Sequence, residues 1–342
     1  MGPQLYWIYA FNIVVNSTLA FFTSILLVEF FVCLFRIKHP RIKVICRILP
    51  FLKICLDLCL YHVSKWALLH GVNPILAEKG TRQLSLLLNP FTGIQFSMKD
   101  GKTFSLADVA ALSVDPIWIQ GTVCIAGLGS IVVILLYLQR VFQEKQQVSR
   151  IVARAIPTSL KDLNVSLAAW MKKRQVTVAS SIEISSPCII GKTILFPERL
   201  LRDLSDKEIE AIIAHEMAHL RWRDCGIRII CSLTASLFWW IPTKWWRKRI
   251  EEMQEQASDA IIHQFGIPGT VLAEAILKTA QRVRADQSQL VFSFVGGKSL
   301  FKNRIEMVLR QPPSKFLRWK IVQYGLLFSA LATVLFGTLW IF

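Results

Sequence analysis

The most chemically informative part of this sequence is the segment His-Glu-Met-Ala-His at residues 215–219. In a helix, histidines four residues apart lie on one face, one turn above the other. Two such imidazoles can bind one Zn²⁺, and Glu216 beside the first of them is placed to act as general base toward a metal-bound water. The spacing therefore indicates metal-assisted hydrolysis with His215 and His219 as ligands. The alternative is a surface helix that carries two solvated histidines.

A second polar cluster supplies the third ligand that a catalytic zinc site needs. Glu255 and Asp259 are four residues apart in a helical pattern, so they share one helix face. We expect Glu255 to complete the metal site, and Asp259 to accept the free N–H of a zinc-bound histidine and so fix its orientation. The sequence thus predicts one Zn²⁺ per chain. The alternative is a solvated acidic face that balances the basic residues at 247–249.

Helices and short strands must position these residues. Ser205 is a suitable N-cap, with Glu208 at the capping-box position, for the helix that carries the histidines. Asp224, five residues after His219, is expected to cap or brace that helix. Upstream, the segments 176–184 and 186–197 are rich in β-branched residues and interrupted by Pro and Gly, which predicts short strands. Such a strand either holds an extended substrate by main-chain pairing or merely covers the helix.

The composition places this site in a membrane protein. Of the 342 residues 53% are apolar and 18% charged, which is more apolar material than one core of this size can bury. Three runs are long and uncharged enough to cross a bilayer, which takes about 20 apolar residues: 5–28, 116–138 and 321–342. A fourth run, 48–69, carries three charged residues, which are costly in lipid unless they face a bundle interior or reach the interface.

The distribution of charge predicts the orientation. Basic residues concentrate in the stretches 36–53 and 140–320, whereas the loop 71–115 holds four basic and four acidic residues. Because short cytoplasmic loops collect Lys and Arg, four spans with both termini outside place both basic stretches in the cytoplasm. Topology and contact with anionic lipids then explain the net charge of +17. Direct nucleic-acid binding is not expected, because the chain has no helix-turn-helix, zinc-finger or RNA-binding motif.

The uncharged segment 229–243 separates the two halves of the site. Its fifteen residues are too few for a comfortable crossing, and a single crossing would put Glu255 on the opposite side of the membrane from the histidines. We therefore expect a buried or membrane-skimming helix. Tryptophans followed by basic residues suit a position among lipid head groups: Trp239, Trp240, Trp245 and Trp246.

These expectations define the fold class as a membrane α-helical protein with four spans and an inserted α+β zinc metallopeptidase domain. An Asp-Gly pair at 100–101 predicts a β-hairpin in the exterior loop. The predicted parts are a transmembrane hairpin of spans 1 and 2 (1–70), an exterior loop (71–115), span 3 (116–140), the cytoplasmic metallopeptidase domain (141–318) and span 4 (319–342).

The motifs around the site are similar to those of a known family. The chain resembles the BlaR/MecR-type membrane metallopeptidases, the antirepressor proteases of β-lactam signalling, in these segments: Ser186-Pro187 with Gly191 and Pro197, residues 215–224, Trp240-Ile-Pro242 with Trp245, and residues 255–259. The resemblance implies a gluzincin-type endopeptidase on the cytoplasmic side of a bacterial inner membrane, with His215, His219 and Glu255 as ligands and Glu216 as base. Because the sequence ends directly after the fourth predicted span, we expect no C-terminal penicillin-binding sensor domain.

The expected function is zinc-dependent endoproteolysis at the cytoplasmic face, in regulated proteolysis and signal transduction. The resemblance implies a protein or peptide substrate, either a transcriptional repressor or the chain itself. One alternative is a quality-control or processing protease of HtpX or CAAX type, which shares the same two motifs. Another is a catalytically idle transducer, against which the intact Glu216 argues. A transporter is disfavoured, because the spans are few and no internal repeat is present.

Overall fold

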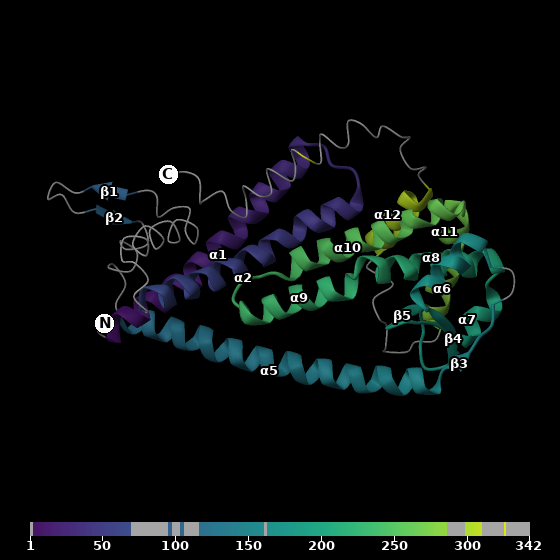
Figure 1. The fold of residues 1–342 in the computed structure, drawn as a ribbon, viewed down its shortest axis with the longest axis horizontal. Helices are drawn as coiled ribbons and strands as arrows, with labels where there is room; N and C mark the ends of the chain where they lie inside the picture. Colours follow the sequence, from purple (N-terminus) through teal and green to yellow (C-terminus); the bar gives the residue numbers. More distant parts are fainter. Residues whose placement is uncertain are drawn as a thin grey trace.

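The computed structural model describes residues 3–69, 95–97, 103–105, 116–160, 163–285, 298–309 and 325. These residues are mostly helical, and Figure 1 shows long helices at one end and a mixed α/β region at the other. The fourth predicted span and most of the predicted exterior loop lie outside the described residues. Within that loop, strands β1 (Gln95–Ser97) and β2 (Thr103–Ser105) pair antiparallel, which confirms the predicted hairpin.

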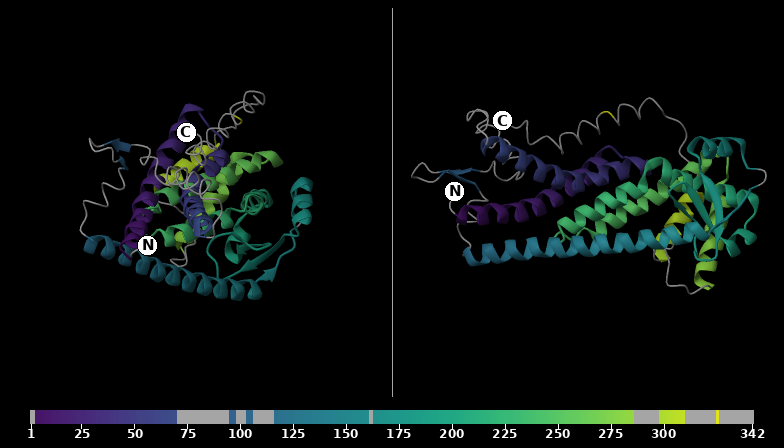
Figure 2. Two further views of the ribbon diagram at one scale, coloured as in Figure 1. Left: turned by 60° about the vertical axis from the view of Figure 1, so that its left-hand side comes forward. Right: turned by 60° about the horizontal axis from the view of Figure 1, so that its bottom comes forward.

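Three long helices form the first region: α1 (Pro3–Leu34), α2 (Pro40–Leu69) and α5 (Pro116–Arg154). Helices α1 and α2 lie side by side as a hairpin, and α5 diverges from them (Figures 1 and 2). Buried aromatic rings join the hairpin, because Phe21 on α1 packs edge-on against Phe51 on α2 with ring centroids 5.3 Å apart. The hairpin and α5 thus enclose a wedge that other elements fill.

Two of these helices are long and apolar enough to cross a membrane, over residues 13–34 of α1 and 117–154 of α5. They overlap the first and third predicted spans, 5–28 and 116–138, and both end later than predicted. The apolar stretch of α5 is almost entirely exposed, with Leu128, Ile131 and Leu135 among its uncovered side chains, as expected of a surface that faces lipid. Helix α2 is continuous through the second predicted span but does not reach the same apolarity, so that span remains a prediction.

Helices α9 (Asp224–Leu237) and α10 (Lys244–Ala260) fill the wedge between α2 and α5 (Figure 1). The single helix expected over 229–243 is instead the end of α9 followed by a turn. That turn packs on α5, where the indole of Trp239 donates to the Ala126 carbonyl at 3.1 Å. Gly129 makes this approach possible, because a Cβ there would lie 2.5 Å from the Trp239 ring.

Trp246 corrects one expectation about the tryptophans. It is fully buried in the cluster that joins α10 to α1 and α2, and its indole N–H donates to the Arg47 carbonyl on α2 at 2.8 Å. The prediction that this ring lies among head groups is therefore wrong, because helix packing encloses both its apolar body and its polar tip. Trp239 and Trp245 remain more than a third exposed.

The α/β region contains a four-stranded sheet in the order β3–β4–β6–β5. Its strands are β3 (Ile156–Pro157), β4 (Thr177–Ser181), β5 (Cys188–Ile190) and β6 (Thr193–Pro197). The short strands predicted within 176–197 are confirmed. Strands β4 and β6 are parallel, with Val178 opposite Ile194, whereas β5 pairs antiparallel with β6 and forms an edge.

Helices cover this sheet and complete the region. They are α6 (Val165–Arg174), α7 (Glu198–Asp203), α8 (Asp206–Trp222), α11 (Gly269–Ala285) and α12 (Lys298–Leu309), with a 3₁₀ turn η1 (Ile261–Phe265) after α10. Ile194 and Phe196 of β6 share one buried core with Ile213 and Met217 of α8. The sheet therefore holds α8 in place, while α11 packs on α8 and α12 packs on α10 and α11.

Candidate metal centre

Helix α8 presents both motif histidines and begins at the predicted cap. The Ser205 hydroxyl accepts from the Glu208 amide, and the Glu208 carboxylate accepts from the Ser205 amide at 2.7 Å, so the predicted capping box is confirmed. Lys278 of α11 also donates to Glu208 at 2.8 Å. Burial would raise the pKa of Glu208, but Lys278 and the cap bonds lower it below its ordinary value of 4.5. The first turn of α8 is thus anchored before the motif begins.

His215 and His219 face each other across one turn of α8, with their Nε2 atoms 3.2 Å apart. Each ring is held from behind, because His215 Nδ1 lies 2.9 Å from Asp259 and His219 Nδ1 lies 2.9 Å from Asp224. When each Nδ1 shares its proton with its aspartate, both Nε2 lone pairs point toward the same place. Such an arrangement is favourable with a cation between the two nitrogens.

Glu255 on α10 brings a carboxylate to that place. Its oxygens lie 3.5 Å from His215 Nε2 and 3.7 Å from His219 Nε2, and the three ligand atoms lie within 4.8 Å of one another. Two nitrogens bound to one tetrahedral zinc are about 3.3 Å apart, close to the observed 3.2 Å. Two histidines and a glutamate form a known catalytic zinc set that leaves a fourth position for water. The donor set therefore fits Zn²⁺.

The electrostatics of the centre also favour a cation. Burial alone would lower the pKa of His215, but the carboxylates of Asp259 and Glu255 overcome this and raise it to about 9. Burial would raise the pKa of Glu255, yet the neighbouring His215 and Arg304 hold it well below its ordinary value. The Glu255 carboxylate therefore stays ionised, and its negative charge favours a cation beside the two histidines.

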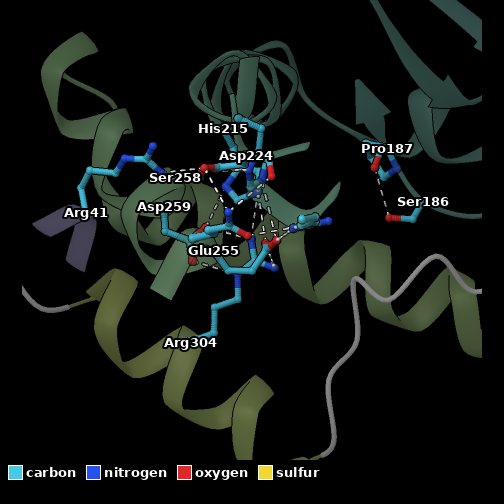
Figure 3. Close-up of polar contacts among 12 residues, drawn as sticks. Arg41, Ser186, Pro187, His215, Asp224, Glu255, Ser258, Asp259 and Arg304 are labelled. Carbon is cyan, nitrogen blue, oxygen red and sulfur yellow. Dashed lines mark hydrogen bonds and ion pairs between the residues drawn. The ribbon is translucent and has the colours of Figure 1, made fainter. Parts of the chain in front are cut away.

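Arg304 on α12 is a site residue that sequence analysis did not single out. Its Nε and Nη2 atoms each donate to Asp259 at 2.8 Å, and its Nη1 lies 3.3 Å from Glu255 (Figure 3). Burial would raise the pKa of Asp259, but Arg304 and His215 lower it. The bidentate pair fixes the aspartate that holds His215. In the sequence, Arg304 is only one more basic residue among several between 298 and 310.

Asp224 has a larger role than the bracing expected of it. It is 1% exposed, and one carboxylate oxygen lies 2.9 Å from His219 Nδ1 while the other accepts from Arg41 of α2 at 2.6 Å. Ser258 lies on the same side of the ring, with its hydroxyl 3.2 Å from His219 Nδ1. Each histidine thus has an aspartate partner, and each aspartate has an arginine. In Figure 3, Arg41 and Arg304 approach the centre from different sides.

Glu216 lines a cavity of about 300 Å³ beside the histidines. Burial raises its pKa above the ordinary value of 4.5, although the charges of His215 and His219 oppose the shift. A carboxylate with a raised pKa is suited to accept a proton and later return it. The cavity is also lined by His219 and Glu255, by residues 147, 148 and 151 of α5, and by residues 183–190, which include β5.

The structure thus brings together His215, Glu216, His219, Glu255 and Asp259, from two helices that a long connection separates in sequence. With apolar helices at one end and this paired-histidine centre at the other, the molecule has the features of a membrane peptidase. Residues 91–308 match the family described as BlaR1 peptidase M56, a range that includes every one of these residues. The chain belongs to this family, and the predicted resemblance is confirmed.

Curated relatives match over shorter segments. The methicillin resistance mecR1 protein of Staphylococcus aureus is 30% identical over 73 residues, which cover 20% of this chain and 12% of that protein. The mecR1 protein of Staphylococcus epidermidis matches to the same extent. Protease HtpX homolog 2 of Sulfurisphaera tokodaii is 35% identical over 72 residues, which cover 21% of this chain and 22% of that protein. The matched segments thus span less than a quarter of each relative.

Proposed function

We propose that this protein is an integral-membrane zinc endopeptidase with one Zn²⁺ per chain, held by His215, His219 and Glu255. The observation that carries the proposal is the convergence of the two Nε2 atoms, 3.2 Å apart, with the Glu255 carboxylate. Membership of a peptidase family supports a hydrolytic role for this cluster. A gluzincin-type fold is part of the proposal, because Glu255 and Asp259 follow the histidine helix on a second helix.

The chain's own residues account for the proton transfers and for the alignment of the ligands. Zn²⁺ in this centre supplies a Lewis acid for a water molecule and for the scissile carbonyl. Glu216 accepts the proton of the attacking water and donates it to the leaving amine. Asp259 and Asp224 accept the Nδ1 protons of the histidines and so keep each Nε2 atom available as a ligand. Arg304 balances the negative charge of the buried Asp259 and of the partly exposed Glu255.

The substrate of this enzyme is an extended segment of polypeptide. Strand β5 forms an edge of the sheet and lines the cavity that contains Glu216, so a peptide that adds to this edge brings its main chain beside the general base. This favours the substrate-holding role for the strand over a purely covering role. We propose a transcriptional repressor or the chain itself as the protein cleaved, in regulated proteolysis and signal transduction.

The proposed setting is the inner membrane of a bacterial cell. Four spans (5–28, 48–69, 116–138 and 321–342) leave both termini outside and the peptidase domain, 141–318, in the cytoplasm. The basic residues of 36–53 and of the domain support this orientation. The apolar surface of α5 supports direct contact with lipid.

A second candidate is a membrane quality-control or processing protease. The 35% identity to an HtpX homolog over 72 residues favours it, and it needs the same metal and the same base. The two candidates differ in substrate, because quality control acts on many unfolded chains whereas regulated proteolysis acts on one. A catalytically idle transducer is a third candidate, which differs from both in having no use for Glu216.

The test uses the full chain purified in detergent, as wild type and as Glu216→Gln, with Glu251→Gln on the exposed face of α10 as the matched control. We expect about one zinc in all three proteins, and cleavage of casein or of the chain itself by the wild type and the control. Loss of a general base should slow cleavage by roughly 10²- to 10⁴-fold. Zinc without cleavage in the wild type would favour the transducer, and a folded wild type without zinc would overturn the proposal.

A further inference from the structure

The first turn of α2 reaches the metal centre through Arg41. One guanidinium nitrogen donates to Asp224 at 2.6 Å, and another donates to the Trp222 carbonyl at 2.8 Å. The guanidinium also lies over the Trp222 ring, 5.2 Å from its centroid. Arg41 therefore binds the junction where α8 ends and α9 begins. This junction follows His219 by only a few residues.

The carboxylate of Asp224 connects Arg41 to the histidine. One oxygen accepts from Arg41, and the other lies 2.9 Å from His219 Nδ1. Gln254, next to Glu255 on α10, has its amide nitrogen 3.3 Å from the oxygen that Arg41 contacts. Elements α2, α8 and α10 thus meet at a single buried carboxylate. Any displacement of Arg41 changes the hydrogen bonding that orients the His219 ring.

This ion pair is not a solvated surface contact. The side chains of Arg41 and Asp224 are 15% and 2% exposed. Exposed ion pairs contribute little, whereas removal of one partner of a buried pair leaves a charge without compensation. Loss of the Arg41 cation would leave the Asp224 carboxylate buried beside His219 without this partner, and the carboxylate would then change its position. Such a change alters the partner of a ligand ring.

The same helical hairpin also holds the other ligand-bearing helix. Trp246 at the start of α10 donates to the Arg47 carbonyl of α2 at 2.8 Å, and Arg47 is paired with Glu29 of α1 at 2.9 Å. Glu255 on α10 and His219 on α8 are therefore both attached to the α1–α2 hairpin, through separate contacts. A movement of the hairpin relative to the sheet would therefore act on the orientation of the His219 ring and on the position of Glu255 relative to α8.

We propose that Arg41 is a positioning residue that acts through Asp224 on His219, and that it makes metal retention depend on the position of the α1–α2 hairpin. The proposal rests on the proposed function in one respect, namely that His219 is a metal ligand. It adds a route by which the membrane-embedded part of the chain regulates the centre. Arg41 itself contacts neither the metal position nor the cavity that contains Glu216.

The experiment measures the rate at which zinc leaves the full chain in lipid nanodiscs when excess chelator is added. The variants are Arg41→Ala, Arg41→Lys, Asp224→Asn and the double variant Arg41→Ala/Asp224→Asn. Lys38→Ala is the matched control, because Lys38 is an exposed basic residue three positions before Arg41. The visible spectrum of the Co²⁺-loaded protein provides a second readout, since it reports ligand geometry without any turnover.

The expected order follows from the distance of each residue from the ligand. Loss of a group that holds a metal-bound histidine typically costs 10- to 100-fold in metal affinity, so Asp224→Asn should release zinc about that much faster. Arg41→Ala acts on His219 only through Asp224, so it should release zinc about 5- to 10-fold faster, with a changed Co²⁺ spectrum. Arg41→Lys should give a smaller effect, because lysine keeps the charge but cannot donate to both Asp224 and the Trp222 carbonyl with the geometry of a guanidinium. The double variant should match Asp224→Asn alone.

Several results would overturn the inference. The inference is wrong if Arg41→Ala releases zinc at the same rate as Lys38→Ala. It is also wrong if the double variant shows the sum of the effects of Arg41→Ala and Asp224→Asn on zinc release, since Arg41 would then act by another route than through Asp224. If Arg41→Ala fails to fold, Arg41→Lys decides: faster zinc release supports the inference and an unchanged rate contradicts it. If the wild type binds zinc but cleaves no substrate, the proposed function is wrong, and the zinc-release measurement still tests the role of Arg41. If the wild type binds no zinc, both the proposed function and this inference are wrong.

Discussion

The two halves of the metal centre have the same local construction but different anchors. His215 and His219 each lie 2.9 Å from an aspartate through Nδ1. Asp259 behind His215 is paired with Arg304 of α12, within the peptidase region, whereas Asp224 behind His219 is paired with Arg41 of α2. One half is therefore completed by the domain itself. The other is completed by the helical hairpin that carries the first candidate membrane helix.

This difference predicts that one half of the centre contributes mainly to the stability of the site and the other half mainly to its regulation. The direct partners of the His215 ring, Asp259 and Arg304, come from α10 and α12, although α10 also packs on α2. The His219 ring is held through Arg41 of α2, so we expect its half of the site to respond to movement of the α1–α2 hairpin. For the proposed metal centre, we expect the His215 half to retain the metal and the His219 half to respond to the hairpin. The predictions below test this division of roles.

The largest expected effect comes from Arg304→Ala, which removes the anchor of the His215 half. The substitution leaves the buried carboxylate of Asp259 without its cation, whereas Glu255 keeps its contact with Arg228. Breaking a buried pair in this way costs about 3–5 kcal/mol. Thermal unfolding of the metal-stripped protein measures the change. The control is Arg282→Ala on α11, whose pair with Asp203 is about 40% exposed and is worth about 1 kcal/mol or less. Equal losses of stability in both variants would contradict the assignment of Arg304.

A smaller effect, and a direct comparison of the halves, comes from Asp259→Asn and Asp224→Asn. Each removes the acceptor that holds a histidine, so each should weaken zinc binding by about 10- to 100-fold in a chelator competition. The two should differ in their dependence on α2: adding Arg41→Ala should weaken zinc binding further with Asp259→Asn but not with Asp224→Asn. If both aspartate variants respond equally to the loss of Arg41, the halves are not separately anchored.

The smallest expected effect comes from the cap of α8, the helix that carries both His215 and His219. Glu208→Gln removes the charge that accepts from Lys278 and the Ser205 amide, and should lower the stability by about 1–2 kcal/mol without a change in zinc release. Because the pKa of Glu208 is lowered by folding, its contribution is complete above pH 4.5 and is lost as the pH falls through the lower folded value. The melting temperature of the variant should therefore approach that of the wild type in acid. Glu251→Gln is the control, and an equal shift there would contradict the capping role.

Local patterns made much of the centre predictable. The capping box at Ser205, the spacing of His215 and His219, and the Glu255–Asp259 pair depend on contacts within one helix, so periodicity and residue type are enough to find them. The strands within 176–197 were predictable for the same reason.

The arginines could not be found in this way. Arg41 and Arg304 lie far from the histidines in the sequence, and a basic side chain has the same sequence pattern whether it is solvated, reaches toward a head group or is buried against a carboxylate. Only the packing of α2 and α12 on the site distinguishes these cases. Trp246 was misassigned for a related reason, because an indole suits a membrane interface and a buried cluster with a carbonyl acceptor equally well.

Helix α5 has a consequence for which bonds this enzyme can reach. It continues without interruption for 39 residues, about 58 Å at 1.5 Å per residue, of which about 30 Å is enough to cross the hydrocarbon layer. Residues 147, 148 and 151 of α5 line the cavity, so with the proposed crossing at 116–140 the cavity wall would stand roughly 10–17 Å along the helix beyond the bilayer. The length of α5 would then set the distance between the bilayer and the cavity. For the proposed enzyme, we expect that a membrane-tethered substrate needs a spacer of about three to five extended residues, and that a peptide bond within the lipid stays out of reach.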